Sequence, residues 1–277
     1  MQTKTTVRIV GALALAMGLV LSEWGLARAV TFVPPTDEGA PRQSTGGASR
    51  NGGHLFDESD PGATKLQVAP ILPQGASGNG GQCLFDESDP GATKLQVTPI
   101  LPQSNYGMTV SERPTILVYL PEHNAPEGLL TVRNEDRTLH YRTIVAISKA
   151  EGIIALTIPE EAPGLIEGKN YQWYFQLKCK GKRHPSNPIA SGWVKRVEQN
   201  RVDSGSQSVS VGESPIELSL EKAASLGAAG VWYDTVAMML QLRQTLPQDR
   251  EIADNWAELM NSVELEAIAN APIVELP

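Results

Sequence analysis

The sequence predicts a mainly β fold with α-helices: an immunoglobulin/fibronectin-like β-sandwich followed by a small C-terminal helical bundle. Two observations predict this fold class. The middle of the chain consists of short apolar or alternating runs separated by turn residues, and the last sixty or so residues carry helical spacing. The expected organisation is 1–29 signal peptide, 30–81 leader, 82–198 sandwich, 199–214 linker and 215–270 helical domain.

The first segment has the three-part layout of a secretory signal peptide. Lys4 and Arg8 precede an uncharged, mostly apolar run over 9–21, and Ala27-Arg28-Ala29 supplies the small residues of a cleavage site. A run of about thirteen residues is short of the roughly twenty that span a bilayer. We expect cleavage between Ala29 and Val30, leaving no integral membrane anchor; an uncleaved anchor is the alternative. Cleavage moves the formal net charge from −8 to −10, which disfavours nucleic acid as a partner.

The leader contains a tandem duplication. It is rich in Gly, Ser, Pro and charge, with too few large apolar residues to offset the entropy of ordering. Residues 55–74 recur as 84–103 with one change, Ala69 to Thr98. Cys83 precedes the second copy, whereas His54 precedes the first. Two copies are too few for a solenoid, so we interpret the repeat as a recent duplication.

The chain has two cysteines, Cys83 and Cys179. An even pair in an exported protein favours a disulfide, which in the chain-entropy model contributes on the order of 4 kcal/mol for a loop of about a hundred residues. Two free thiols or a metal site are the alternatives, although two cysteines without a nearby histidine pair make a poor zinc set.

Seven strands are expected in the β-rich region, and two of them alternate with period two. Leu139, Tyr141, Thr143, Val145 and Ile147 share one face, as do alternate residues over 171–179, so these faces are expected to meet in the core. The seven expected strands are Leu95 to Leu101, Thr115 to Leu120, Leu129 to Arg133, His140 to Ile147, Ile153 to Ile158, Tyr171 to Cys179 and Ile189 to Val197.

The spacing of Leu165, Gly168 and Tyr171 is that of a tyrosine corner, in which the hydroxyl bonds the backbone a few residues upstream. Tyr171 is therefore interpreted as structural rather than catalytic, and Trp173 as core. Trp193, on the last strand, is either a core residue or a recognition residue at the sheet edge.

The C-terminal segment predicts three helices and a final turn. The first begins at Pro215, capped by Ser214, and stops near Gly227; the second covers Val231 to Leu246; the third begins near Asp249. The last turn spans 265–269. Trp232 and Trp256 are expected as core anchors, with Trp232 and Tyr233 also held as candidates for recognition.

These motifs together resemble an uncharacterised exported family, domain of unknown function 928, whose members come mostly from cyanobacteria. The residues that carry the resemblance, over about 81–275, are Pro114-Thr115, Val118-Tyr119-Leu120-Pro121, Leu165-x-x-Gly168-x-x-Tyr171-x-Trp173, Cys179, Gly192-Trp193, Gly230-Val231-Trp232-Tyr233-Asp234 and Leu242-Arg243. The resemblance implies a periplasmic or outer-membrane-associated setting and a cysteine near the domain start paired with the later one. It implies no activity, and the duplicated leader departs from the family pattern.

We expect no catalytic, cofactor or metal site in this sequence. The histidines have no HExxH spacing, no G-x-S-x-G or phosphate loop is present, and Asp86-Glu87-Ser88-Asp89 lacks EF-hand spacing and reads as a solvated turn. We therefore expect a non-catalytic envelope module in which the sandwich binds an envelope protein or glycan and the helices add a second contact surface. The alternatives are a hydrolase of envelope polysaccharide using loop carboxylates such as Glu122, Glu127 and Asp136, or a structural envelope component.

Overall fold

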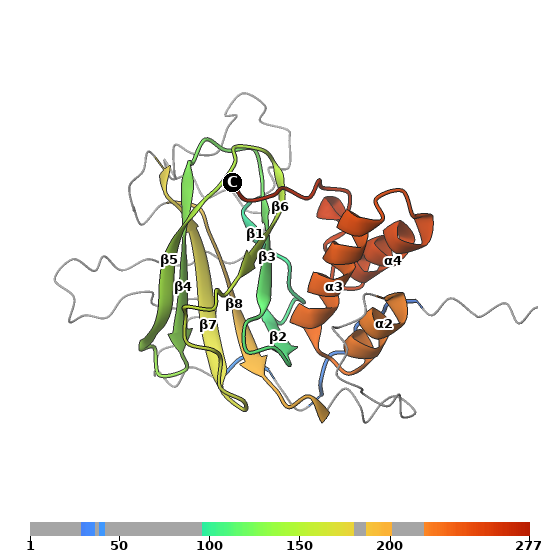
Figure 1. The fold of residues 1–277 in the computed structure, drawn as a ribbon, viewed down its shortest axis with the longest axis horizontal. Coiled ribbons are helices and arrows are strands. Elements are labelled where there is room, and N and C mark those ends of the chain that lie inside the picture. The colour runs from blue at the N-terminus through green and yellow to red at the C-terminus, as the bar shows by residue number, and fades with distance from the viewer. Residues whose placement is uncertain (1–28, 37–38, 42–95, 180–186, 201–218) are drawn as a thin grey trace, which may run out of the picture.

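The computed structural model describes residues 29–36, 39–41, 96–179, 187–200 and 219–277. These residues form two β-sheets, three α-helices and one 3-10 turn (Figure 1). The strands are β1 Thr98–Pro99, β2 Tyr106–Thr109, β3 Thr115–Leu120, β4 Glu127–Asn134, β5 Leu139–Ala146, β6 Gly152–Thr157, β7 Asn170–Leu177 and β8 Ile189–Arg196. The helices are α2 Leu220–Ala228, α3 Trp232–Thr245 and α4 Arg250–Asn261, followed by η2 Glu266–Ile268.

The larger sheet has the order β2-β8-β7-β4-β5. Its pairings are antiparallel except for β2 and β8, which run parallel with Tyr106 opposite Trp193. Tyr171, Trp173, Phe175 and Leu177 of β7 are each at most 1% exposed, as their alternation predicts for a face that meets the core. Strands β2 and β5 are the edges of this sheet.

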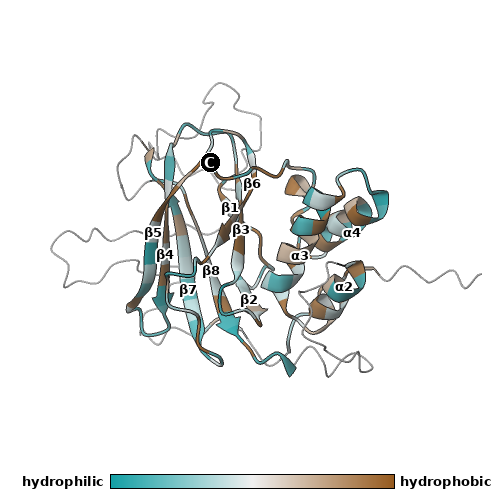
Figure 2. Ribbon diagram, in the orientation of Figure 1, coloured by the Kyte–Doolittle hydropathy of each residue, from teal (hydrophilic) through white to brown (hydrophobic). Residues whose placement is uncertain are grey.

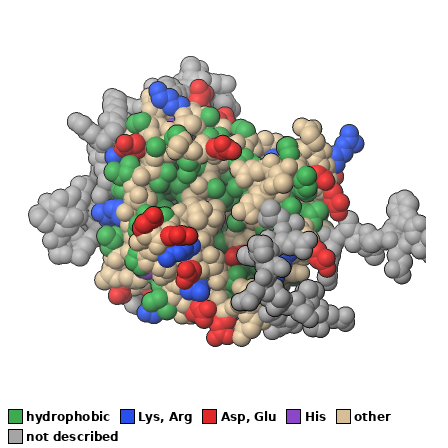
Figure 3. Space-filling model, in the orientation of Figure 1, with side chains coloured by type: hydrophobic (Ala, Val, Ile, Leu, Met, Phe, Trp, Pro, Cys, Tyr) green, Lys and Arg blue, Asp and Glu red, His purple; other side chains and the backbone are tan. Residues whose placement is uncertain are grey.

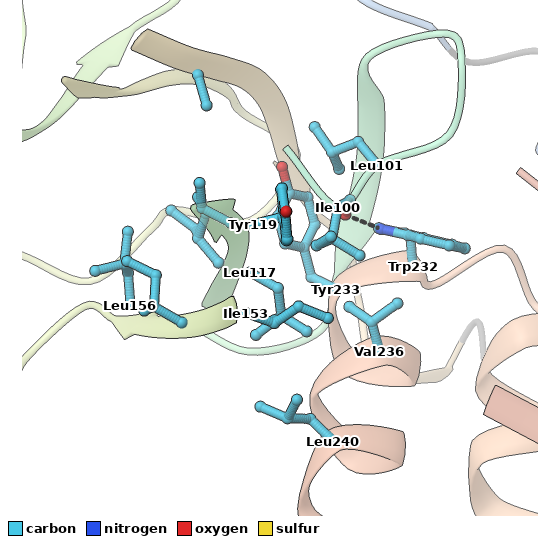
Figure 4. Close-up of a cluster of buried hydrophobic side chains, with 14 of the residues drawn as sticks. Ile100, Leu101, Leu117, Tyr119, Ile153, Leu156, Trp232, Tyr233, Val236 and Leu240 are labelled. Carbon is cyan, nitrogen blue, oxygen red and sulfur yellow. Dashed lines mark hydrogen bonds between the residues drawn. The ribbon is translucent and has the colours of Figure 1, made fainter. Parts of the chain in front are cut away.

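The smaller sheet, with the order β1-β3-β6, lies between the larger sheet and the helices (Figure 1). Its central strand β3 is buried on both faces, since Ile116 through Leu120 are each at most 1% exposed. Leu117 and Tyr119 point toward α3, from which Val236 and Leu240 approach (Figure 4). Residues of one strand alternate between faces, so Ile116 and Val118 lie toward the larger sheet. The continuous apolar run in β3 follows from this middle position.

The helices begin and end at recognisable signals. Ser219 caps α2 by accepting a hydrogen bond from Lys222 N, and Asp249 caps α4 by accepting bonds from Glu251 N and Ile252 N. Gly230, with φ of +75°, makes the turn between α2 and α3 in a region that suits glycine. Helix α4 alternates between hydrophobic and hydrophilic residues (Figure 2), as expected for a helix with one buried side.

One buried cluster extends through both sheets and the helical layer. Leu101 from the loop after β1 lies against the backbone of Gly192 in β8, and α3 packs on β3 and β2. The helices therefore complete the core by covering the outer face of the smaller sheet. Among the described residues, no helix has the length and apolar character needed to cross a membrane.

The first described residues correct the expectation of an unpacked leader over 30–81. Val30 is fully buried, and its backbone N donates to Asn255 Oδ1 at 2.7 Å. Val33 N donates to Gly227 O at 3.0 Å, and the Phe32 ring meets Trp232 edge-on at 4.8 Å. Residues 30–33 thus pack on all three helices, whereas 42–95, with the first repeat copy, lies outside the described residues.

Most of the expected elements are present, but several details differ. The first helix begins at Leu220 after the cap Ser219, not at Pro215 after Ser214, because the Ser219 side chain is the one that accepts a hydrogen bond from Lys222 N. The first expected strand is only Thr98–Pro99. Strand β2 was not predicted, and Leu139 does not share the buried face of β5, because it is 53% exposed. The cause is a register shift: Val132 pairs with Tyr141 while Arg133 pairs with Leu139, which leaves His140 as an extra residue. The bulge turns Leu139 to the outer face.

Candidate functional site

The Gly230–Asp234 motif fixes the start of α3 to the sheets. Trp232 is completely buried, and its Nε1 donates to Ile100 O at 2.8 Å (Figure 4). The Tyr233 hydroxyl accepts from Trp173 Nε1 at 2.6 Å and donates to Trp193 O at 3.0 Å. One phenol therefore joins α3, β7 and β8.

Trp193, Trp232 and Tyr233 were candidates for recognition, with a core position as the alternative, and this geometry places all three in the core. Their exposures are 7%, 0% and 1%, so none can reach an external partner in this conformation. Burial raises the pKa of Tyr233 far above that of an exposed phenol, which keeps the hydroxyl protonated as a hydrogen-bond donor. Their role in this structure is to join the helices to the sheets.

Asp234 adds a polar contact at the same junction. Its carboxylate accepts from Val110 N at 3.2 Å and also from the Thr109 side chain and Ser111 backbone, all just beyond or at the end of β2. Burial outweighs these bonds and raises the pKa of Asp234 to about 6. The junction thus contains an ionisable group sensitive to mildly acidic pH.

The loop before β7 has the geometry of a corner. The Tyr171 hydroxyl accepts from Ile166 N at 2.9 Å, Leu165 is 1% exposed, and Gly168 has φ of +77°. Arg196 holds the same loop from β8 by donating to Leu165 O at 2.7 Å. Leu165, Gly168 and Tyr171 therefore have a structural role, because their contacts fix the path of the backbone into β7.

Two of the carboxylates considered for hydrolysis, Glu127 and Asp136, do not converge. Glu127, the first residue of β4, pairs with Lys178 at 2.5 Å, and Asp136, in the turn after β4, accepts from Thr138. The length of β4 separates them by roughly 20 Å, beyond the spacing that glycoside hydrolysis requires. Glu122 is exposed in the loop after β3. Within the described ranges, no group of three or more His, Cys, Asp or Glu residues is arranged to hold a metal ion.

Two histidines are held within the fold. His123 is 1% exposed in the loop between β3 and β4, and burial lowers its pKa. His140 Nε2 lies 3.0 Å from Pro163 O, and its ring centroid is 4.8 Å from that of Tyr171. The His140 ring thus packs against the corner.

Cys179 is 7% exposed just after β7. Its expected partner Cys83 lies outside the described residues, as do residues 1–28 of the expected signal peptide, so the pairing and the cleavage between Ala29 and Val30 stay predictions.

The most open apolar feature of the sheets is the outer side of edge strand β5. Leu139 and Ile144 are 53% and 55% exposed, and Arg142 and Ala146 are exposed on the same side. In the part of the chain that the structure describes, β5 pairs with β4 alone. We call the outer side and free edge of residues 139–146 the β5 surface. The sequence periodicity did not predict this exposed apolar surface, because it placed Leu139 on the face of the strand that points into the core.

A shallow hollow lies between the end of α3 and the start of α4. Arg243, Leu246, Ile252 and Ile273 contribute to its lining. The Arg243 guanidinium lies 5.0 Å from the centre of the Trp256 ring, a cation–π contact that helps hold the two helices together.

Charged side chains are interleaved on the face seen in Figure 3, where acidic and basic groups lie close together. Arg196 lies 3.8 Å from Glu112 and 3.6 Å from Glu167, and Arg113 lies 3.5 Å from Glu112. Exposed pairs of this kind contribute little stability and form no field of a single sign.

The comparisons agree with the resemblance carried by the sequence motifs. Residues 46–273, most of the chain, match the family described as Domain of Unknown Function (DUF928). A search of the curated proteins gives no match to this chain. The match spans the duplicated segment, both sheets and all three helices, and the chain therefore belongs to the DUF928 family.

Proposed function

We propose that this chain is an exported, non-catalytic interaction module that binds a protein of the cell envelope through the β5 surface. The observation that carries the proposal is an eight-residue edge strand with two half-exposed aliphatic side chains, Leu139 and Ile144. Long, apolar edge strands are templates for a further strand, and natural proteins usually protect them with charges, prolines or bulges. Here the bulge lies at His140, and the regular stretch 141–146 has one charged residue, Arg142.

Strand addition is the recognition mode that fits this surface. An extended segment of the partner would pair with the free backbone groups of β5, while its side chains contact Leu139 and Ile144. A glycan is less well supported, because sugar sites commonly present an exposed aromatic ring. Every tryptophan in the described ranges is at most 7% exposed.

We infer an immunoglobulin-like sandwich as the framework of the module. Support comes from the facing sheets with orders β1-β3-β6 and β2-β8-β7-β4-β5, from the parallel pairing of β2 with β8, and from the Tyr171 hydroxyl bond to Ile166 N. In such a framework, β5 is an edge strand and is available to a partner.

Export and a Cys83–Cys179 disulfide are part of the same proposal. The signal-peptide layout and the pair of cysteines support a periplasmic or outer-membrane-associated location. Intact mass of the native protein, measured before and after reduction and alkylation, tests both. A chain that starts at Met1 with two free thiols would contradict them.

Substitution of the β5 surface tests the interaction itself. Ile144→Lys places a charge on the open side of the edge strand, and Ile166→Lys makes the same change at a residue that is 53% exposed in a loop elsewhere. We expect I144K to lose at least tenfold in recovery of a specific partner from native envelope extract and I166K to recover it fully. Equal recovery by both variants would contradict binding at β5, and specific retention on a glycan array would favour the glycan instead.

A further inference from the structure

Residues 97–101 fill a slot at the edge of the smaller sheet. Thr98 and Pro99 pair with β3, and Ile100 N donates to Leu117 O at 3.0 Å. Ile100 O accepts the Trp232 Nε1 bond at 2.8 Å. We call this position, between β3 and the start of α3, the β1 slot.

The slot selects apolar side chains. Val97, Ile100 and Leu101 are 6%, 1% and 4% exposed, and Leu101 reaches the backbone of Gly192 in the facing sheet. Figure 4 shows Ile100 and Leu101 beside Trp232 and Tyr233. Any segment that takes this slot must therefore present the same aliphatic pattern with a free carbonyl at the Ile100 position.

The chain contains a second segment that meets this requirement. Residues 67–74 read QVAPILPQ and residues 96–103 read QVTPILPQ, so they differ only at Ala69 and Thr98. The Thr98 hydroxyl makes one exposed, local bond, to Gln96 O at 2.7 Å. Every buried side chain and every backbone contact of the slot is thus available to residues 67–74.

We propose that the β1 slot accepts either copy, with residues 67–74 of the same chain as the alternative to 96–103. Exchange of 68–72 for 97–101 lengthens the connection to β2 from four residues, 102–105, to 33. It shortens the preceding connection from 55 residues, 42–96, to 26. Loop closure varies roughly with the 3/2 power of length, which favours 96–103 on the order of tenfold. The second copy therefore occupies the slot in most molecules, and the first copy occupies it in a minority.

The test uses the mature full-length chain in reductant, so that a tether at Cys83 plays no part. Four variants are compared: Ile100→Asp, Ile71→Asp, the double variant and, as a control at a buried position with no duplicate, Leu117→Asp. Unfolding is followed in urea, and amide exchange reports which residue is protected at the slot. The conservative pair I100A and I71A/I100A repeats the comparison with a smaller perturbation, in case the charged variants fail to fold.

The proposal predicts that I71D behaves as the native chain. I100D should still fold, with its unfolding equilibrium constant raised on the order of tenfold and protection moved from residue 100 to residue 71. The double variant and L117D should lose far more stability. The proposal is overturned if I100D is as damaging as the double variant, or if I100D folds without new amide protection at Ile71 and Leu72. The alanine pair is judged by the same two criteria.

Discussion

Replacement of Tyr233 by phenylalanine should loosen the junction between helices and sheets without creating a cavity. The ring stays, but Trp173 Nε1 loses its acceptor at 2.6 Å and Trp193 O loses its donor at 3.0 Å. Both partners are buried, and an unsatisfied buried polar group costs about 1–3 kcal/mol. We therefore expect Y233F to lower the free energy of unfolding by about 2 kcal/mol and the melting temperature by roughly 4–8 °C.

Urea unfolding followed by tryptophan fluorescence measures this loss. The matched control is Tyr174→Phe, which removes the hydroxyl of a tyrosine that is 2% exposed in β7, the strand of Trp173. No hydrogen bond of the Tyr174 hydroxyl occurs among the described residues, so Y174F should change the stability by less than about 0.5 kcal/mol. Equal effects of Y233F and Y174F, or a Y233F effect below about 0.5 kcal/mol, would refute the assignment of Tyr233 as the hydroxyl that joins α3 to both strands.

Three further predictions follow from buried polar groups and from the packed N-terminal residues. The pKa of Asp234 is raised from 3.8 to about 6, so the folded protein binds a proton at this carboxyl more tightly than the unfolded chain does. The stability that comes from this proton is therefore lost as pH rises from about 4 to 6. The free energy of unfolding of the native chain, measured relative to that of D234N, should change by up to about 3 kcal/mol between about pH 4 and 6. If this difference stays constant with pH, the pKa of Asp234 is not raised. Asn255→Ala should leave Val30 N unpaired and lower the free energy of unfolding in urea by about 1–2 kcal/mol. Asp254→Ala, on the exposed side of α4, should lower it by less than about 0.5 kcal/mol. Val30→Asp should increase proteolysis within residues 30–41, and an unchanged cleavage pattern would argue against the packing of Val30 on α4.

Local signals account for the elements that could be predicted. Strand β3 lies between Pro114 and Pro121, and its apolar run needs no knowledge of its neighbours. Helix α4 starts after Asp249, a residue type that caps helices, and its Ile252, Trp256 and Leu259 keep helical spacing.

The features that sequence reasoning missed depend on contacts between distant segments. Strand β2 is four residues long and contains Gly107, and it exists through parallel pairing with β8, more than eighty residues later. The exposure of Leu139 follows from a bulge, which is a matter of register between strands. The burial of Val30 requires Asn255, which lies 225 residues away.

The candidate surface was harder to predict than the fold, because exposed and buried aromatic residues look alike in a sequence. Trp193 and Trp232 suggested recognition, yet both have partners inside the molecule. Ile144 gave no signal of its own, since strands with one apolar face usually bury their isoleucines. It became a candidate only when its exposure and the free edge of β5 were known.

Site-specific photo-crosslinking in the native envelope tests the interaction at β5 most directly. A photoreactive amino acid at position 144 samples the β5 surface, and the same group at position 166 samples an equally exposed loop position. We expect a discrete cross-linked protein species from position 144 that is absent from position 166 and is lost when Leu139 is changed to Lys. Absence of any species from position 144, or the same species from both positions, would contradict β5 as the binding surface.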